Sequence, residues 1–316
     1  MKSTISIVTT CLNAEETIKD TIESVLKQTE SDFEIIVVDD GSTDDTRKVV
    51  EDINDNRICY FYQNNSGVSA ARNFGLSKCY SQYIAFLDSD DLWPKDYLSK
   101  MVSALEADND FGAAYSPITL IYSNGKKIES YKRPEGKNGW ITSDLFRNSF
   151  IWPSAIVLKS SACRGFFFDE SLETSEDSDA FLRLSVKIKF VFVSEVEALH
   201  MISVNSLSKN AGVTFRRLLS MERFYFKLGG DKVIHGKIAK RRLSHASRKL
   251  AEYQRKQNAR MSAIKLFKHA IKYWPYDMRL YCGLFRSVIQ NKNNDSQPDW
   301  TMPESLSEPK AANRLN

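Results

Sequence analysis

Hydrophobic and polar positions alternate between two kinds of segment over the first hundred residues. Short apolar runs rich in β-branched residues are typical of strands covered on both faces. They are separated by segments that carry one apolar helical face. Strands are predicted at residues 5–9, 33–38, 57–62 and 83–87, and helices at residues 15–28, 44–53, 67–78 and 94–107. This order predicts right-handed crossovers and a mostly parallel sheet with helices on both faces.

The pattern becomes less regular in the middle of the chain and helical after it. We expect strands at residues 113–121, 155–158 and 190–193, and a helix at residues 178–187. From about residue 214 the apolar spacing is helical, and residues 291–316 have the composition of a disordered tail. The prediction is a Rossmann-like α/β domain at residues 1–208, a smaller all-α region at residues 209–290, and the tail.

Charge divides the chain at the same place. Residues 209–280 hold 19 Lys and Arg against 4 Asp and Glu, whereas the first 208 residues hold 21 basic and 32 acidic residues. An acidic body joined to a basic helical part suggests two units with different partners. Two interpretations of the basic part stay open: a solvated helical face, or a surface for an anionic membrane or a phosphate-bearing substrate.

Cysteine usage and hydropathy bear on the compartment. The five cysteines are scattered and no pair has metal-ligand spacing, so we expect free buried thiols in a reducing cytosol. No run of residues approaches the roughly 18 apolar residues that a membrane helix needs, and the first residues do not have the pattern of a signal peptide. The expected location is cytoplasmic, with peripheral attachment at the inner face of the membrane left open.

Polar clusters follow three of the predicted strands. They are Asp39-Asp40-Gly41-Ser42, Asn64-Asn65-Ser66-Gly67 and Asp88-Ser89-Asp90-Asp91. Each cluster alone has the composition of an ordinary turn. Ligands of open α/β sheets bind beyond the carboxyl ends of the strands, so three clusters on one predicted edge favour a ligand site.

The sequence FLDSDD, residues 86–91, places three carboxylates within four positions. Like charges this close disfavour one another's ionisation, so the cluster needs a positive partner. Mg²⁺ and Mn²⁺ prefer carboxylate oxygen and are often completed by substrate phosphates. We therefore predict that Asp88 and Asp90 hold Mn²⁺ or Mg²⁺.

Six segments resemble, in order and spacing, the inverting family 2 glycosyltransferases of GT-A fold. They are SIVTTCLNAEETIKDTIESVLKQT, DFEIIVVDDGSTDDT, NNSGVSAARNFGL, YIAFLDSDD, FFFDESL and SEDSDAFLRL. The match covers residues 4 to about 208, and it is specific because six motifs agree in sequence order. The resemblance implies a GT-A domain that uses a nucleoside-diphosphate sugar and a divalent metal.

The resemblance also implies roles for single residues of the donor site. Thr10 and Asn13, with Glu15, lie where the family's first strand-end turn surrounds the nucleotide base, although the Pro and Tyr common in that turn are absent here. Asp40 matches the aspartate that receives the uracil N–H, with Asp39 beside it. The other expected nucleotide-sugar contacts are Gly67, Arg72, Asp88 and Ser89, while Asp90 is the preferred metal ligand.

A second acidic motif is expected to supply the general base. The resemblance assigns that role to Asp177, with Glu176 and Asp179 close by. A carboxylate opposite the leaving diphosphate takes the proton of the acceptor hydroxyl, and one displacement then inverts the sugar without an enzyme nucleophile. Acids also favour the first turn of a helix, which is the alternative interpretation of this motif. His200 is either a diphosphate contact displaced in register or a structural histidine.

Together these features predict a metal-dependent inverting hexosyl- or N-acetylhexosaminyltransferase. The resemblance implies a UDP-sugar donor and a glycan or lipid-linked glycan acceptor in surface polysaccharide biosynthesis, and no nucleic-acid partner. A nucleotidyltransferase is the rival enzyme, but it would open with a Gly-rich phosphate loop, and this chain has no glycine before Gly41. The other alternative is a non-catalytic nucleotide-sugar-binding scaffold acting through its helical region, where residues 250–285 weakly resemble a tetratricopeptide helix pair.

Overall fold

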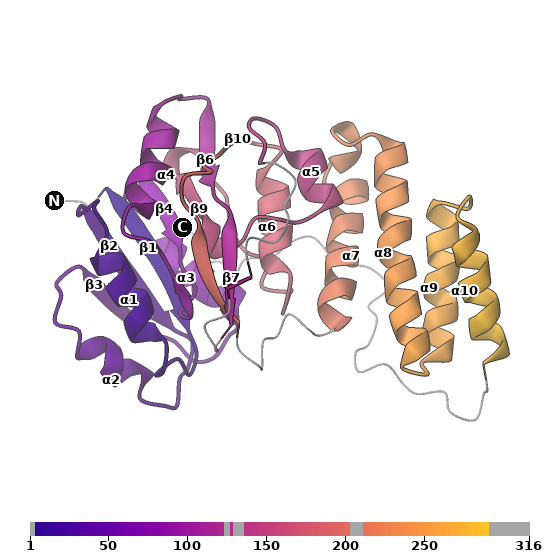
Figure 1. Ribbon diagram of the computed structural model, residues 1–316, viewed down its shortest axis with the longest axis horizontal. Helices are drawn as coiled ribbons and strands as arrows, with labels where there is room; N and C mark the ends of the chain where they lie inside the picture. Colours follow the sequence, from indigo (N-terminus) through magenta and orange to yellow (C-terminus); the bar gives the residue numbers. More distant parts are fainter. Residues whose placement is uncertain (1–3, 123–126, 129–135, 203–210, 291–316) are drawn as a thin grey trace. The chain divides into compact units, whose positions relative to one another are not determined.

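The protein is described from a computed structural model that covers residues 4–122, 127–128, 136–202 and 211–290 (Figure 1). Its contacts divide the chain into two compact units. The first unit takes its described residues from 4–141 and 150–202. The second takes them from 142–149 and 211–290, so a short segment inside the sequence of the first unit belongs to the second.

The first unit is built on a seven-stranded sheet with β1 near its middle. Across the sheet the strands are β10 (Lys189–Phe192), β6 (Phe111–Tyr115), β9 (Ile156–Lys159), β4 (Tyr83–Phe86), β1 (Ile5–Cys11), β2 (Phe33–Asp39) and β3 (Ile58–Tyr62). Only β9 runs antiparallel to its neighbours. The predicted mostly parallel α/β sheet is confirmed.

Helices cover both faces of this sheet because its inner strands are apolar on both sides (Figure 1). Ile5, Ile7 and Ile35 face one core, where α1 (Ile18–Leu26), α2 (Thr46–Glu51) and α4 (Tyr97–Glu106) pack. Ile36 and Val38 face the other core, against α3 (Val68–Lys78). A helix at α6 (Glu176–Leu184) joins this second face through Phe181, which stacks on Phe166 with ring centroids 6.2 Å apart.

A second sheet begins where the predicted strand 113–121 breaks. That segment forms two strands, β6 and then β7 (Ile118–Tyr122), separated by Ser116 and Pro117. Proline has no N–H to donate to a ladder, and the chain changes sheets at this point. The order in the second sheet is β5 (Asp91–Leu92), β11 (Ala198–Ile202), β7 and β8 (Lys127–Ile128). Its pairing of β5 with β11 places His200 opposite Asp91.

The second unit is helical. Its helices are α5 (Thr142–Arg147), α7 (Ala211–Lys227), α8 (Gly236–Lys256), α9 (Arg260–Tyr273) and α10 (Met278–Ile289). The buried Phe146 of α5 packs on Phe224 and Tyr225 of α7, with ring centroids 6.3 and 6.1 Å apart. The predicted helical C-terminal region is confirmed, whereas its tetratricopeptide likeness stays a prediction. Residues 291–316, the expected tail, lie outside the described residues.

The start of α2 is not capped as the spacing of its residues suggests. Ser42 and Asp45 have the spacing of a helix-start cap, but neither side chain caps α2. Instead Asp44 Oδ1 accepts a hydrogen bond from the Thr46 N–H (3.0 Å), and Ser42 Oγ accepts from the Asn13 N–H (2.8 Å). A backbone N–H beyond the end of the neighbouring strand binds Ser42, which the local spacing cannot reveal. Among the described helices, none combines the length and apolar character that crossing a bilayer requires.

Candidate functional site

The carboxyl ends of β1, β2, β3 and β4 share one edge of the large sheet. In its register Cys11 pairs with Asp39, Asp39 pairs with Tyr62, and Val8 pairs with Phe86. Because these strands are parallel, the polar clusters that follow them lie at the same edge. The sequence prediction that the three clusters meet there is confirmed.

At this edge, Asn13 and Glu15 hold the loop that leads from β2 to α2. Asn13 lies in the left-handed region, with φ of 50°, and its Oδ1 accepts a hydrogen bond from the Thr43 N–H (2.9 Å). Glu15 Oε2 accepts from the Asp45 N–H (2.8 Å). Thr10 is buried at the end of β1. The first turn and the loop after β2 are therefore tied together by predicted base-contacting residues.

Asp39 is a buried acceptor with both oxygens engaged. Oδ1 accepts from the Ser42 N–H (2.7 Å) and Oδ2 from the Tyr60 hydroxyl (2.7 Å). Burial, and then the bond to Asp39, raise the pKa of Tyr60, so the phenol stays a donor. Asp39 thus fixes the start of the loop.

Asp40 holds the loop that precedes α3. Its Oδ1 accepts from Gln63 Nε2 (2.7 Å) and the Ser66 N–H (2.9 Å), and its Oδ2 accepts from the Gly67 N–H (2.9 Å). Gly67 has φ of 89°, a conformation that favours glycine. A carboxylate offers about four acceptor positions, so Asp40 keeps one on Oδ2 for a further donor.

Arg72 joins the two acidic motifs. Its Nη2 donates to Asp88 Oδ1 (2.6 Å) and its Nη1 donates to Glu176 Oε1 (2.7 Å). The guanidinium lies 5.3 Å from the centroid of the Phe168 ring, and the residue is 5% exposed. Burial acts to lower the pKa of Arg72, but Asp88 and Glu176 outweigh burial and raise it. Segments far apart in the sequence therefore share one fixed positive charge.

Asp90, Asp91 and His200 form a second group, with one ligand atom from each within 4.8 Å of the others. His200 Nδ1 lies 2.7 Å from Asp91 Oδ1. The second oxygen, Asp91 Oδ2, is buried and has no hydrogen-bond partner in the part of the chain that the structure describes. A buried carboxylate oxygen without a donor is costly, and a divalent cation would satisfy it. Oxygen and imidazole donors fit Mn²⁺ or a similar ion.

Electrostatics agree with a cation at this group. Burial, and then Asp91 and Asp88, raise the pKa of Asp90 to about 6. Burial also raises the pKa of Asp91. For His200, burial acts to lower the pKa, but the bond to Asp91 and the charges of Asp91, Asp90 and Asp88 together outweigh burial and raise the pKa. Negative groups have converged here, and a bound cation would offset their repulsion.

The comparison with protein families decides the identity of the scaffold. The model of the family described as "Glycosyl transferase family 2" matches residues 6–171, which is more than half of the chain. This chain belongs to glycosyl transferase family 2. The six resembling segments identified the same family, and its GT-A fold is the α/β fold described above.

Curated relatives of this family 2 member agree. It is 30% identical over 234 residues to the putative teichuronic acid biosynthesis glycosyltransferase TuaG of Bacillus subtilis, covering 71% of this chain and 91% of TuaG. It is 34% identical over 168 residues to WfgD of Escherichia coli, a UDP-Glc:α-D-GlcNAc-diphosphoundecaprenol β-1,3-glucosyltransferase, covering 52% of this chain and 63% of WfgD. An uncharacterised glycosyltransferase of Rickettsia felis is 41% identical over 188 residues, which are 58% of this chain but only 30% of that protein.

Solved structures show the same fold. The crystal structure of S. aureus TarS residues 1–349 in complex with UDP superposes with a TM-score of 0.60 at 17% identity, covering 92% of this chain and 88% of that one. The same TarS fragment has been solved with UDP-GlcNAc. At this identity the likeness establishes the fold alone.

The predicted base motif of this family 2 member lies at the start of α6, beyond the matched residues. Glu176 is buried and bound to Arg72, and burial raises its pKa. Asp179 is buried in an ion pair with Arg183 (2.7 Å). Asp177 is partly exposed, and its Oδ1 accepts from the adjacent Ser178 N–H (2.6 Å). Of these three acids, Asp177 has no ion pair within the described residues.

The sequence did not reveal the whole Asp90, Asp91 and His200 group, which could hold a metal ion. It paired Asp88 with Asp90, whereas the structure places Asp88 on Arg72 and brings Asp91 and His200 to Asp90. Trp152 was also missed; its ring lies 4.9 Å from that of His200. The signal for Asp91 was the third carboxylate of FLDSDD. The signal for His200 was its position shortly before Asn205-Ser206-Leu207-Ser208 in the sequence. The pairing of β5 with β11, however, could not be predicted from either segment. Ser89, which lies between Asp88 and Asp90 in the sequence, is partly buried.

Proposed function

We propose that this chain is a metal-dependent inverting glycosyltransferase that uses a UDP-sugar donor. Its acceptor is a glycan or lipid-linked glycan in surface polysaccharide biosynthesis. The observation that carries the proposal is Arg72, which binds Asp88 of the first acidic motif and Glu176 of the second. Both motifs therefore belong to one site on a family 2 scaffold. The names of TuaG and WfgD, and the UDP complex of TarS, support the pathway and donor class.

The acidic group at β5 is the proposed metal site. Asp90, Asp91 and His200 would hold Mn²⁺ or Mg²⁺, and Asp88 would contact the donor from beside them. The ion would neutralise the charge that grows on the departing diphosphate. His200 contributes an imidazole whose Nδ1 is already fixed by Asp91, so only its Nε2 faces a further ligand.

Asp177 is the proposed general base. Glu176 and Asp179 are each bound to an arginine, so their carboxylates are already occupied. Asp177 accepts only the Ser178 N–H through Oδ1, so it retains an oxygen for the acceptor hydroxyl. Arg72 then has a positioning role: it keeps the base motif at a set distance from the donor motif.

The test is a thermal-shift and turnover assay with UDP, UDP-glucose and UDP-GlcNAc, each with Mn²⁺, Mg²⁺ or EDTA. A ligand at about 100 times its Kd adds roughly 2.7 kcal/mol of stability. We expect stabilisation by UDP only with metal, and its loss in Asp90→Asn. Asp177→Asn should keep UDP binding and lose transfer, while the matched control Asp110→Asn, on an exposed ion pair, should change neither.

Three outcomes would count against the proposal. Stabilisation by a nucleotide that depends neither on metal nor on Asp90 would show that donor binding does not use the proposed metal site. Full transfer by Asp177→Asn would move the base elsewhere, and unchanged biological activity without any transfer would favour a non-catalytic scaffold. Because no glycine-rich phosphate loop follows β1, we place a nucleotidyltransferase behind these alternatives.

We also propose that the protein works in the cytoplasm and binds peripherally to anionic membrane. Residues 209–280 carry a large excess of Lys and Arg, and each basic residue near an anionic surface adds about 1 kcal/mol of attraction. Flotation with phosphatidylglycerol vesicles should recover the protein at low salt and release it at high salt. If the protein does not float with the vesicles at low salt, the proposed membrane binding is wrong.

A further inference from the structure

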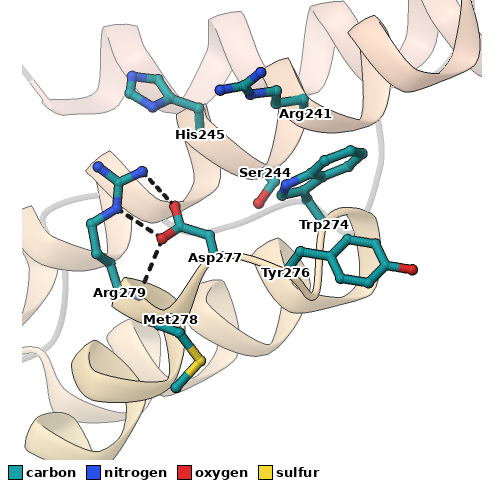
Figure 2. Close-up of a pocket in the computed structure, with 8 residues that line it drawn as sticks. All are labelled: Arg241, Ser244, His245, Trp274, Tyr276, Asp277, Met278 and Arg279. Carbon is teal, nitrogen blue, oxygen red and sulfur yellow. Dashed lines mark hydrogen bonds and ion pairs between the residues drawn. The ribbon is translucent and has the colours of Figure 1, made fainter.

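A polar pocket of about 290 Å³ lies within the helical unit. Figure 2 shows Arg241, Ser244 and His245 on α8, with the turn between α9 and α10 and the first residues of α10 opposite them. That turn and the first residues of α10 supply the other lining residues: Trp274, Tyr276, Asp277, Met278 and Arg279. None of these residues belongs to the proposed donor site, so the pocket needs its own explanation.

One wall presents a guanidinium whose orientation is fixed. Arg279 Nε and Nη2 donate to the two oxygens of Asp277, each at 2.8 Å (Figure 2). Asp277 also accepts from the Arg279 N–H (3.1 Å), which caps α10. Asp277 is the one carboxylate among the lining residues; both of its oxygens are bound to Arg279, and Oδ2 also lies 3.8 Å from Nε of Arg248. The remaining nitrogen of Arg279, Nη1, is left for a ligand.

The opposite wall adds an uncompensated positive charge. Arg241 is exposed and has no hydrogen bond or ion pair to the residues that the structure describes. Burial lowers the pKa of His245, and the cations around it, Lys249, Arg242 and Arg248 among them, lower it further. The potential in the pocket is therefore positive, which suits an anion. Two guanidinium groups are well matched to a carboxylate or phosphate.

Aromatic rings give the pocket a second character. Trp274 and Tyr276 meet edge to face, with ring centroids 5.5 Å apart. Tyr276 is 80% exposed, although a large aromatic surface is normally buried. Such rings present a flat apolar face, while the Ser244 hydroxyl offers a polar contact nearby. A simple phosphate would not need the rings, whereas a sugar ring has both an apolar face and hydroxyl groups.

We propose that this pocket binds an acidic saccharide. Its phosphate or carboxylate would lie between Arg241 and Nη1 of Arg279, and its ring would lie against Trp274. This site goes beyond the proposed donor site because it needs neither the metal nor Asp90. It gives the helical unit a binding role of its own, independent of any transfer reaction.

The test uses the full chain labelled with ¹⁵N and follows the indole N–H signal of Trp274, identified by its loss in Trp274→Phe. Glucose 6-phosphate, glucuronic acid, inorganic phosphate and glucose are titrated to tens of millimolar, a range that detects weak sites. We expect saturable shifts with glucose 6-phosphate or glucuronic acid, and none with glucose. Arg241→Gln should weaken binding about tenfold or more, since charged hydrogen bonds are worth 1.5–3 kcal/mol.

Controls make each outcome decisive. Lys240→Gln removes the same charge from the neighbouring exposed position of α8 and should leave the affinity unchanged. Asp90→Asn should also leave it unchanged, which separates this site from the donor site. A stronger response to glucose 6-phosphate would identify a phosphorylated sugar, and a stronger response to glucuronic acid a uronic acid.

Four results would overturn the proposal. The first is no shift with any anion. The second is equal weakening by Arg241→Gln and Lys240→Gln, which would mean diffuse charge attraction. The third is an equal response to inorganic phosphate and glucose 6-phosphate, which would show that the sugar ring does not contribute to binding. The fourth is a Trp274 signal that moves with phosphatidylglycerol vesicles but with no sugar anion, which would show that this region binds a membrane surface and not a saccharide.

Discussion

Arg72 is the residue on which the site geometry depends. It is buried between Asp88 and Glu176, and Glu176 is itself buried. The sequence predicted each of these residues as part of the site through the resemblance of its motifs to family 2 glycosyltransferases. It could not predict that they bind one another, since the contacts depend on how α3, β4 and α6 pack.

Replacing Arg72 should reveal the free-energy cost of burying the Glu176 carboxylate without a partner. Arg72→Met leaves Glu176 buried without a partner, and breaking such a pair costs about 3–5 kcal/mol of folding free energy. The double variant Arg72→Met/Glu176→Met should recover most of that loss, because it removes the unpaired charge. Urea unfolding of the three proteins measures this. A double variant no more stable than Arg72→Met would contradict the buried pair.

The cysteine thiols should differ sharply in reactivity. Burial, and then neighbouring carboxylates, raise the pKa of Cys11 to about 12, and burial raises those of Cys79 and Cys163 to about 12 as well. Alkylation requires the thiolate, and a pKa raised by three units lowers the thiolate fraction about a thousandfold at pH 8. Cys282 is the exposed cysteine, so iodoacetamide should first modify Cys282.

The matched variant for this experiment is Cys282→Ser, which should remove the fast phase seen by mass spectrometry. Because the raised pKa values leave the buried thiols protonated until strongly alkaline pH, their slow labelling should rise with pH without levelling off near pH 9. Fast labelling of Cys11 in the native protein would show that the end of β1 is open to solvent.

At the scale of elements, the alternation of apolar and polar residues predicted the inner strands well. β1, β2 and β4 are buried on both faces, and their apolar runs are continuous. The prediction failed at residues 113–121, where Pro117 separates two strands that belong to different sheets. The hydrophobicity of a strand indicates that it is buried, but it does not indicate to which sheet the strand belongs.

Gly75 marks the closest approach of α3 to the sheet. A Cβ at this position would overlap the Val8 side chain and also meet Val38. Gly75→Ala should therefore destabilise the protein by about 1–3 kcal/mol, the usual cost of overpacking a core, despite the better helix propensity of alanine. Thermal unfolding measures the loss. Ser77→Ala on the same helix is the control, and equal stability of both variants would contradict this packing.

At the scale of the whole molecule, the two units do not follow the order of the sequence. The charge pattern placed the boundary near residue 208, yet residues 142–149 belong to the helical unit. Their buried Leu145 and Phe146 pack within that unit. A helix of six residues is too short for its apolar pattern to indicate the unit in which it packs. The sequence therefore could not predict that residues 142–149 belong to the helical unit.

Truncation at the predicted boundary should therefore fail. A fragment of residues 1–208 keeps α5 but lacks α7 and α8, which leaves Leu145 and Phe146 exposed and prone to association. Size-exclusion chromatography should show aggregates or oligomers. The fragment carrying Leu145→Ser and Phe146→Asp should be monomeric. A monomeric unsubstituted fragment would show that α5 is stable without the other helices.

The same segment sets a delay during synthesis. Phe146 leaves the ribosome roughly 80 residues before Phe224, the ring it packs against, so at about 5–20 residues per second it waits roughly 4–16 seconds for its partner. For that interval the growing chain carries an uncovered aromatic side chain. Slow codons between positions 150 and 224 should lower the soluble yield, whereas slow codons after position 290 should not.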